Sequence, residues 1–270
     1  MKIRKAVLPV AGMGTRFFPA TKVVPKELLP VGNKPVIQWL VEEAVASGIE
    51  EIIFVISPDK TLIREHFSSQ PELEARLLAR GKLECLKILQ PLHTLARLTY
   101  VIQEEPRGDG DAILKAEQAV GKEPFLILFG DDLVKSKVPA ARQLVDAFHG
   151  EGVLAVERVA REHLENYGVI DPGRTLGRQM EVKHLIEKPA PGQAPSDFGI
   201  IGKYVVTSAI FDALRSSKPG RDGELRLIDG FAKLLQSRER LWAYEIEGER
   251  FDTGTPEGLL KATQAFFEIS

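Results

Sequence analysis

The fold is decided by the stretch Lys5-Ala-Val-Leu-Pro-Val-Ala-Gly-Met-Gly-Thr-Arg16, near the start of the chain. Its apolar run, residues 6–11, is typical of a buried strand, and the run ends at Gly12 and Gly14. A glycine turn after a strand allows backbone N–H groups to approach a phosphate closely. The stretch therefore predicts a buried strand that leads into a phosphate-binding loop.

Three cations, Arg16, Lys22 and Lys26, follow in the same loop. Because their charges suit a polyanion, we interpret the segment as a loop that holds a triphosphate. The alternative is that Gly12 and Gly14 only form a tight turn and that the lysines are solvated. Three cations in one proline-containing loop favour the first interpretation.

Two better-known phosphate loops do not fit this stretch. The dinucleotide fingerprint G-x-G-x-x-G runs straight into a helix. Here Phe17 stands at the third glycine position, and Pro19 and Pro25 oppose an immediate helix. The Walker pattern G-x-x-x-x-G-K-[S/T] is absent from the sequence.

Composition sets further bounds. With 270 residues, of which 44% are hydrophobic, we expect one domain over residues 1–270 with a sizeable core. The net charge of −2 gives no basic field for nucleic acid. The single cysteine, Cys85, excludes an internal disulfide and a cysteine-rich zinc site. No signal peptide and no apolar run of 18 residues is seen, so we expect a cytoplasmic protein without a membrane partner.

Strands alternate with helices along the first half of the chain. Expected strands cover 51–57, 98–103 and 124–129, and expected helices cover 35–47, 59–67, 71–80 and 108–120. This alternation predicts parallel βαβ units, and hence a Rossmann-like, mostly parallel central sheet flanked by helices. Ligands of such sheets bind beyond the carboxyl ends of the strands. Gly12, Gln103 and Asp131 each follow or end a strand, so one site is expected to collect all three.

The second half alternates less regularly. Expected helices cover 139–150, 224–238 and 255–267, and expected strands cover 152–159, 168–170, 182–187, 200–206 and 241–246. The many glycines and prolines between 160 and 200 favour a smaller β-rich lobe. We divide the domain into halves at about 1–135 and 136–270. The segment 68–97 reads as an insertion without chemistry of its own.

Paired carboxylates follow the strand at 124–129. Asp131 and Asp132 end a buried run, where carboxylates are costly unless they meet a cation. Asp252 lies in a second turn between a strand and a helix. Mg²⁺ favours one or two carboxylates plus phosphate oxygens, so carboxylates in turns of this kind suit that ion. Helix or turn capping is the alternative, and Thr253 or Thr255 is an equal candidate for capping the last helix.

These motifs resemble one family. Gly12-Met-Gly14-Thr-Arg16 with Pro25-Lys26-Glu27 is similar to the signature of the sugar-1-phosphate nucleotidylyltransferases. Ala20-Thr-Lys22 and Lys34-Pro35-Val-Ile-Gln38 most resemble the bacterial UTP–glucose-1-phosphate uridylyltransferases. The resemblance recurs in blocks from residue 5 to about residue 260 and covers nearly the whole chain.

The resemblance implies an enzyme that transfers a uridylyl group from UTP to glucose 1-phosphate. The products are UDP-glucose and pyrophosphate, Mg²⁺ assists an in-line displacement, and the enzyme is a homo-oligomer, either a dimer or a tetramer. No enzyme nucleophile is needed, because the phosphate of glucose 1-phosphate attacks the α-phosphorus. Catalysis is then positioning plus charge neutralisation. Arg16 and Lys26 would hold the triphosphate, and Lys188 would align the attacking phosphate.

The resemblance also implies a role for individual residues. The nucleotide would be held by Ala11, Gly12, Gly14, Glu27, Gln103 and Gly108, the sugar by Gly168, Glu187 and Lys188, and the metal by Asp131 and Asp252. At two of these positions the alternative that the residues have no binding role stays open. A glutamine at a strand end, such as Gln103, is usually just exposed, and the tripeptide Glu187-Lys188-Pro189 is common at strand ends.

The sequence departs from the family at one motif. Where the family usually has Leu-Gly-His-Ala, this chain has Asp109-Gly110-Asp111-Ala112. A carboxylate in place of an imidazole adds repulsion beside phosphates unless a metal or a lysine compensates. Two rivals therefore stand beside the uridylyltransferase: an enzyme for another pair, such as one that uses dTTP, and a non-catalytic sensor of a nucleotide sugar.

Overall fold

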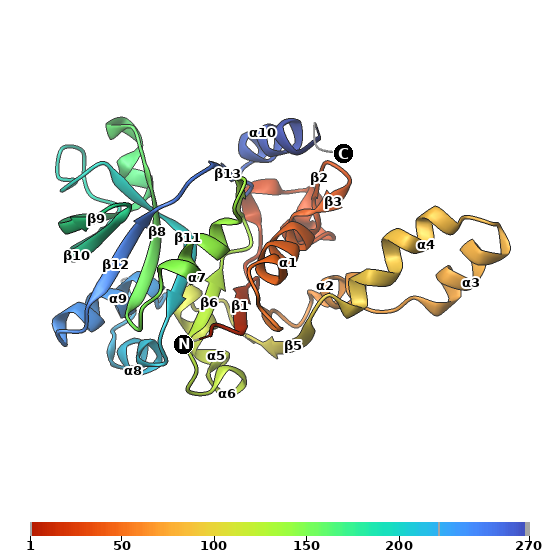
Figure 1. Cartoon of the computed structure of the whole chain (residues 1–270), viewed down its shortest axis with the longest axis horizontal. Helices are drawn as coiled ribbons and strands as arrows, with labels where there is room; N and C mark the ends of the chain where they lie inside the picture. Colours follow the sequence, from red (N-terminus) through yellow and green to blue (C-terminus); the bar gives the residue numbers. More distant parts are fainter. Residues whose placement is uncertain (1, 221, 268–270) are drawn as a thin grey trace.

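A nine-stranded sheet forms the centre of the computed structural model, which describes residues 2–220 and 222–267. Its strands are β1 (Lys5–Pro9), β4 (Glu51–Ile56), β5 (Arg97–Ile102), β6 (Phe125–Leu128), β8 (Gly152–Arg158), β9 (Gly168–Leu176), β10 (Gln179–Glu187), β11 (Phe198–Val206) and β12 (Leu241–Glu245). They are ordered β5-β4-β1-β6-β11-β8-β12-β10-β9, and helices cover the sheet (Figure 1). The predicted α/β fold class is confirmed.

Strand direction changes along this sheet. The neighbours β5, β4, β1 and β6 are all parallel, as the alternating pattern predicts, and Ala6 of β1 lies between Ile52 and Leu126. Strand β11 is antiparallel to both β6 and β8, and β10 is antiparallel to β12 and β9, whereas β12 is parallel to β8. The sheet as a whole is therefore mixed. The β-rich segment continues the central sheet, and the division at about residue 135 stays a prediction.

Two short pairings lie outside this sheet. Strands β2 (Pro30–Val31) and β3 (Lys34–Pro35) form a tight hairpin after the glycine loop. Strands β7 (Asp132–Lys135) and β13 (Glu249–Asp252) pair antiparallel, with Asp252 opposite Asp132. The sequence pattern did not predict β7 or β13. Their pairing brings the turn that contains Asp131 and Asp132 next to the turn that contains Asp252. The paired residues Asp132 and Asp252 are 120 positions apart in the sequence.

Helices pack on both faces of the sheet. The helices in the described parts of the chain are α1 (Val36–Ala46), α2 (Thr61–His66), α3 (Pro71–Ala79), α4 (Leu83–Leu89), α5 (Asp109–Lys115), α6 (Glu117–Val120), α7 (Ala140–Ala147), α8 (Ala209–Ser216), α9 (Leu227–Gln236) and α10 (Pro256–Phe267), of which α3 and α4 do not pack on the sheet. Short 3-10 turns cover Thr15–Phe17, Ala20–Lys22, Lys26–Leu28, Gln90–Thr94 and Arg161–Asn166. Successive strand residues point to opposite faces. Leu8 therefore joins one core cluster with Leu40 of α1, while Val7 joins another with Phe211 of α8.

Several element boundaries differ from expectation. The helix expected over 108–120 is broken at Ala116 into α5 and α6. The strands expected at 168–170 and 182–187 are longer, and α4 and α8 were not predicted. The last helix begins at Pro256, and Thr255 Oγ1 accepts a hydrogen bond from the Gly258 N–H at 3.1 Å. Thr255, one of the capping candidates, is therefore the residue that caps this helix.

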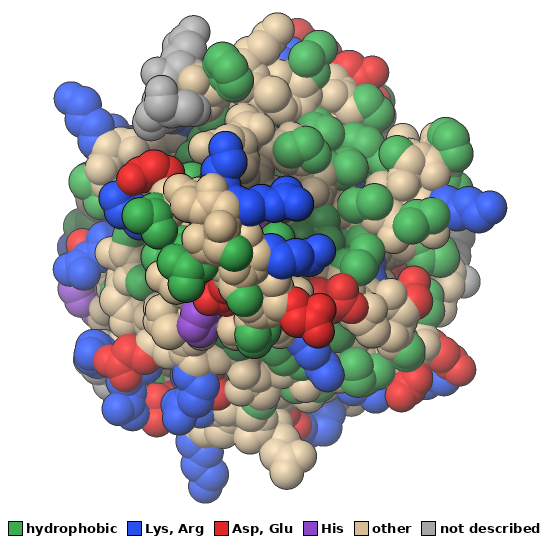
Figure 2. Space-filling model, turned by 90° about the vertical axis from the view of Figure 1, so that its right-hand side faces the viewer, with side chains coloured by type: hydrophobic (Ala, Val, Ile, Leu, Met, Phe, Trp, Pro, Cys, Tyr) green, Lys and Arg blue, Asp and Glu red, His purple; other side chains and the backbone are tan. Residues whose placement is uncertain are grey.

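The helices α3 and α4 project from the body of the protein (Figure 1). Seen from their side, the molecule shows hydrophobic side chains mixed with charged side chains of both signs (Figure 2). Helix α3 buries none of its residues, and Leu78, Leu83 and Ile88 of this segment are exposed. None of the helices in the described parts of the chain is long and apolar enough to cross a membrane.

Candidate active site

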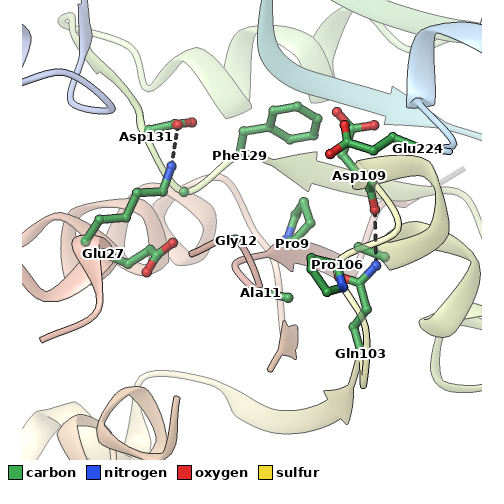
Figure 3. Close-up of a pocket in the computed structure, with 14 residues that line it drawn as sticks. Pro9, Ala11, Gly12, Glu27, Gln103, Pro106, Asp109, Phe129, Asp131 and Glu224 are labelled. Atoms are coloured by element: carbon green, nitrogen blue, oxygen red, sulfur yellow. Dashed lines mark hydrogen bonds and ion pairs between the residues drawn. The ribbon is translucent and has the colours of Figure 1, made fainter. Parts of the chain in front are cut away.

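A cavity of about 260 Å³ lies where the parallel strands end (Figure 3). It is lined by Pro9, Ala11, Gly12, Lys26, Glu27, Gln103, Pro106, Gly108, Asp109, Ala112, Phe129, Gly130, Asp131 and Glu224. Strands β1, β5 and β6 each deliver residues to it from their carboxyl ends. The topology thus brings Gly12, Gln103 and Asp131 together at one edge of the sheet, as the strand pattern predicts.

The two loop glycines have different surroundings. No atom lies within 4 Å of the point where a Cβ on Gly12 would sit, so the backbone there is open to a ligand. Gly14 has a φ of 67°, and a Cβ at this residue would lie 3.2 Å from Cβ of Lys26. Its carbonyl oxygen accepts a hydrogen bond from Thr21 Oγ1 at 2.8 Å. Gly14 shapes the loop and does not line the cavity.

Lys26 and Asp131 form an ion pair in the cavity wall, with 2.6 Å between Lys26 Nζ and Asp131 Oδ2. Burial by itself lowers the pKa of Lys26, but the carboxylates of Asp131 and Glu27 together outweigh it and raise the pKa above its ordinary value. Burial likewise favours neutral Asp131, and the Lys26 ammonium group, with Arg250 and Arg16, outweighs it and lowers the pKa of that carboxyl. Both groups are therefore held in their charged forms.

A second buried ion pair supports the cavity from behind. Glu27, only 1% exposed, lies 2.8 Å from Nζ of Lys60, which also donates to the Val10 carbonyl oxygen at 2.6 Å. Burial raises the pKa of Glu27 and lowers that of Lys60, and the attraction between the two opposes both shifts. The sequence analysis missed Lys60. Its signal is its place four residues beyond the end of β4 at Ile56, at the same sheet edge.

The side-chain amide of Gln103 is held by Gly108 and by Asp111, which belongs to the motif that departs from the family sequence. Its Nε2 donates to Asp111 Oδ2 at 2.7 Å and to the Gly108 carbonyl oxygen at 3.1 Å. Both partners are acceptors, so the amide nitrogen must face them, and Oε1 is oriented the other way. The buried Gln103 side chain can therefore offer an acceptor to a ligand in the cavity.

The candidate metal ligands converge at Gly254. A Cβ at this glycine would lie 2.8 Å from Asp131 Oδ2, 2.9 Å from Asp252 Oδ1 and 3.3 Å from Arg16 Nη1. Arg16 Nη1 also lies 3.4 Å from the Gly254 carbonyl oxygen, and Asp252 Oδ1 accepts a hydrogen bond from the Gly254 N–H at 2.9 Å. Asp252 therefore binds the turn and does not cap the last helix. Within the described residues no group of three or more His, Cys, Asp or Glu side chains could hold a metal, so this carboxylate pair is the candidate.

Asp132 has a structural environment instead. Its Oδ2 accepts a hydrogen bond from the Gly202 N–H at 2.7 Å, and its Oδ1 is paired with Arg250. Arg250 also contacts Glu157 at 3.1 Å and the Tyr167 hydroxyl at 3.0 Å. Burial disfavours the charged guanidinium, but Asp132 and Glu157 outweigh it and raise the Arg250 pKa. This network, also missed from the sequence, joins the turn after β6 to the start of β9.

A smaller cavity of about 120 Å³ adjoins the first. It is lined by Asp109, Phe129, Gly168, Glu187, Ile200, Tyr204, Arg226, Leu227, Ile228 and Phe231. It contains two of the predicted sugar-binding residues, Gly168 and Glu187. A Cβ at Gly168 would lie 2.7 Å from Ile228 Cδ1 and 3.2 Å from Glu187 Oε2, so a side chain there would intrude. Asp109 and Phe129 line both cavities and form their shared wall.

Lys188 lies at the edge of this arrangement. Its side chain is 61% exposed, its Nζ is 3.8 Å from Glu187 Oε1, and it lines neither cavity. Its φ of 46° is unusual for a residue with a side chain. The exposed ammonium group is thus available to an anion that approaches from outside the smaller cavity.

Known proteins match this chain over nearly its whole length. A family model described as nucleotidyl transferase matches residues 5–268. The chain belongs to the nucleotidyl transferase family. Within the family, it is 43% identical to the UTP–glucose-1-phosphate uridylyltransferase of Bacillus subtilis (strain 168), over 98% of this chain and 91% of that protein.

Solved structures of the same kind also match this nucleotidyl transferase. A UDP-glucose pyrophosphorylase complexed with UDP-glucose superposes with a TM-score of 0.89 and 34% identity, over 99% of this chain and 100% of that one. A UTP-bound UGPase from Acinetobacter baumannii gives a TM-score of 0.89 with 33% identity, over 98% of this chain and 93% of that one.

Proposed function

We propose that the protein transfers the uridylyl group of UTP to glucose 1-phosphate, giving UDP-glucose and pyrophosphate. One geometric observation supports this above others. A cavity with an ionised Lys26–Asp131 pair shares a wall with a second cavity that contains Glu187. A nucleotide in the first and a sugar in the second would meet at that wall. The names of the relatives supply the identity of the two substrates.

The reaction needs no covalent intermediate with the protein. An oxygen of the sugar phosphate forms a bond to the α-phosphorus of UTP, and the bond from that phosphorus to the bridging oxygen of pyrophosphate breaks. Arg16 and Lys26 bind the triphosphate and neutralise the charge that moves to pyrophosphate. Lys188 holds the phosphate of the sugar at the mouth of the smaller cavity. Fixed cations of this kind lower the barrier by positioning and by electrostatic stabilisation.

The base is recognised at the other end of the larger cavity. The cavity is lined there by Ala11, by Gly12 with its open backbone, by Gln103 with its oriented amide, and by Gly108, and these residues offer donors and acceptors to a base. Glu27, paired with Lys60, lines the same cavity. The oriented Oε1 of Gln103 suits an N–H donor, such as the N3–H of uracil.

Mg²⁺ fits the pair Asp131 and Asp252. Their oxygens approach one point beside Gly254, where only a glycine leaves room, and two carboxylates plus phosphate oxygens suit this ion. When bound, Mg²⁺ supplies positive charge beside the phosphates. The residues of the chain hold those phosphates through Arg16 and Lys26, and the Lys26 ammonium group keeps Asp131 ionised.

A pyrophosphate-release assay tests the proposal. The purified protein is given UTP, dTTP, ATP or GTP, each with glucose 1-phosphate or another hexose 1-phosphate, with Mg²⁺ or with a chelator. We expect a high rate of pyrophosphate release only when UTP, glucose 1-phosphate and Mg²⁺ are all present. A higher kcat/KM with dTTP would replace the uridylyl assignment, and release with no pair would favour a sensor of nucleotide sugars. Assembly into a dimer or tetramer and a cytoplasmic location remain predictions, which light scattering and fractionation test.

A further inference from the structure

Asp109 occupies a position between the two cavities that the backbone fixes firmly. Gly108 has a φ of 100°, and a Cβ there would lie 2.2 Å from the Leu225 carbonyl oxygen. The same carbonyl oxygen accepts a hydrogen bond from the Gly110 N–H at 2.9 Å. The residues on both sides of Asp109 are thus clamped against the segment that leads into α9. Its side chain has little freedom to leave the shared wall.

One carboxylate oxygen of Asp109 is used by the protein. Oδ1 accepts a hydrogen bond from the Leu227 N–H at 2.7 Å. No Lys or Arg within the described ranges forms an ion pair with this carboxylate, since Arg226 pairs with Asp222 and Glu224 instead. A carboxylate has about four lone-pair sites. Asp109 therefore keeps capacity to accept hydrogen bonds from a ligand in either cavity.

The groups that face Asp109 suit a polyhydroxylated ring. Glu187 lines the same small cavity, and its charge adds to the effect of burial, which raises the pKa of Asp109 to about 6. With a pKa of about 6, Asp109 is mostly ionised at neutral pH and its carboxylate is an acceptor, and Tyr204 and Arg226 are the other titratable groups of the lining. Phe129, Ile228 and Phe231 add apolar surface. Hydroxyl donors and C–H faces are what such a lining recognises.

We propose that Asp109 is a specificity-determining residue that accepts a hydrogen bond from one hydroxyl group of the hexose, opposite Glu187. The inference rests on the proposed transfer to glucose 1-phosphate. The aspartate stands where the family wording has an apolar leucine, so this chain has an acceptor that a leucine cannot provide. A hexose 1-phosphate with that hydroxyl removed should fit the cavity but leave the carboxylate in the shared wall without its donor.

The Asp109→Asn variant tests the proposal. Its side-chain oxygen can still accept from the Leu227 N–H, so the clamp is kept while the charged acceptor is lost. The kcat/KM is measured for glucose 1-phosphate and for its 2-, 3-, 4- and 6-deoxy analogues, with UTP saturating. Glu105→Gln is the matched control, because this exposed carboxylate lies in the same loop and pairs only with Arg107 in the described structure.

We expect the wild type to discriminate against one deoxy sugar by about 10- to 100-fold, the range for a hydrogen bond to a charged group. Asp109→Asn should lose most of that discrimination and keep the discrimination at the other three positions. The KM for UTP should stay within about twofold. A uniform loss for all five sugars, or no change, would show that Asp109 only anchors Leu227 and would overturn the proposal.

A binding measurement separates this inference from the proposed function. The Kd values of UDP and UDP-glucose are measured by calorimetry on the wild type and on Asp109→Asn. The glucose moiety should add less affinity in the variant than in the wild type, whether or not pyrophosphate is released. If no pyrophosphate is released but this difference in affinity is found, the proposed reaction is wrong and the role of Asp109 stands. An equal gain from glucose in both proteins would count against the role of Asp109.

Discussion

Lys26 Nζ lies 2.6 Å from Asp131 Oδ2, which ties the glycine-loop segment to the turn after β6 across 105 residues of sequence. Each partner keeps the other charged within the cavity wall. A triphosphate would therefore meet a cation and a carboxylate proposed to bind the metal, both already in place. Such pre-arrangement means that little reorganisation is needed when the substrate binds.

Replacing Asp131 tests its role in catalysis. Asp131→Asn should lower kcat by about 10²–10³, the usual range when one group that stabilises transition-state charge is lost. The protein should stay folded, because the Asp131 carbonyl oxygen, which accepts from Thr253, is unchanged. Thermal melting and kcat are measured on the same sample. The control is Asp146→Asn, an exposed partner of Arg142. A stability loss of about 1 kcal/mol with kcat preserved would identify Asp131 as a cap instead.

The two proposed phosphate subsites should respond differently to truncation. Lys26→Ala should raise KM for UTP by about tenfold or more, since a charge-assisted contact is lost, with a smaller effect on KM for glucose 1-phosphate. Lys188→Ala should chiefly raise KM for glucose 1-phosphate and also lower kcat, because we propose that this lysine aligns the attacking phosphate. Arginine at either position should restore activity only in part. If both alanine variants weaken UTP equally and leave the sugar phosphate unaffected, the division into subsites is wrong.

Breaking the second ion pair should destabilise the protein. Lys60→Met leaves Glu27, 1% exposed, without its cation, and loss of one partner of a buried pair costs about 3–5 kcal/mol in unfolding free energy. Adding Glu27→Gln in the same chain should recover part of that loss. Lys87→Met, which breaks an exposed pair with Glu84, should change stability by less than about 0.5 kcal/mol. Urea unfolding measures all three, and a loss under 1 kcal/mol for Lys60→Met would contradict a buried pair.

Asp109 should make stability fall as the pH rises. Its pKa is raised from 3.8 to about 6 by burial, so the folded protein binds this proton more tightly than the unfolded chain. The protonated form favours folding below pH 4, and that advantage is lost as the pH passes through 6. The shift corresponds to at most about 3 kcal/mol, less because the side chain is partly exposed.

The comparison with Asp109→Asn measures this effect. The variant lacks the ionisable group, so its unfolding free energy relative to the wild type should increase between pH 4.5 and pH 7.5. Urea unfolding at several pH values, with Glu105→Gln as the control, follows the difference. A difference independent of pH would mean that Asp109 has an ordinary pKa.

Sequence patterns predicted the parallel half of the fold because its strands are short apolar runs separated by helices with 3.6-residue periodicity. The patterns also predicted the strand ends that carry Gly12, Gln103 and Asp131, and in the structure these residues line one cavity. The pairing of β7 with β13 was not predictable in this way. Each strand has only four residues, and the partners are set by tertiary contacts far apart in the chain.

The missed residues share a physical reason. Lys60 and Arg250 are charged side chains that look solvated in a sequence, and only the fold shows that carboxylates neutralise them within the protein. The direction of the β11 strand was likewise hidden, because apolar runs carry no signal for parallel or antiparallel pairing. Asp109 and Asp111 stood out only against the family wording, and their contacts with Leu227 and Gln103 came from the structure.

Gly254 limits how this chain can vary over evolutionary time. Any side chain at this residue would enter the space between the oxygens of Asp131 and Asp252. Even alanine, the smallest replacement, would compete with whatever cation the two carboxylates attract. Substitution of Gly254 is therefore sterically excluded, although the glycine itself takes no part in the chemistry. Residues of the neighbouring turn can be substituted only where their side chains point away from the space between the two carboxylates.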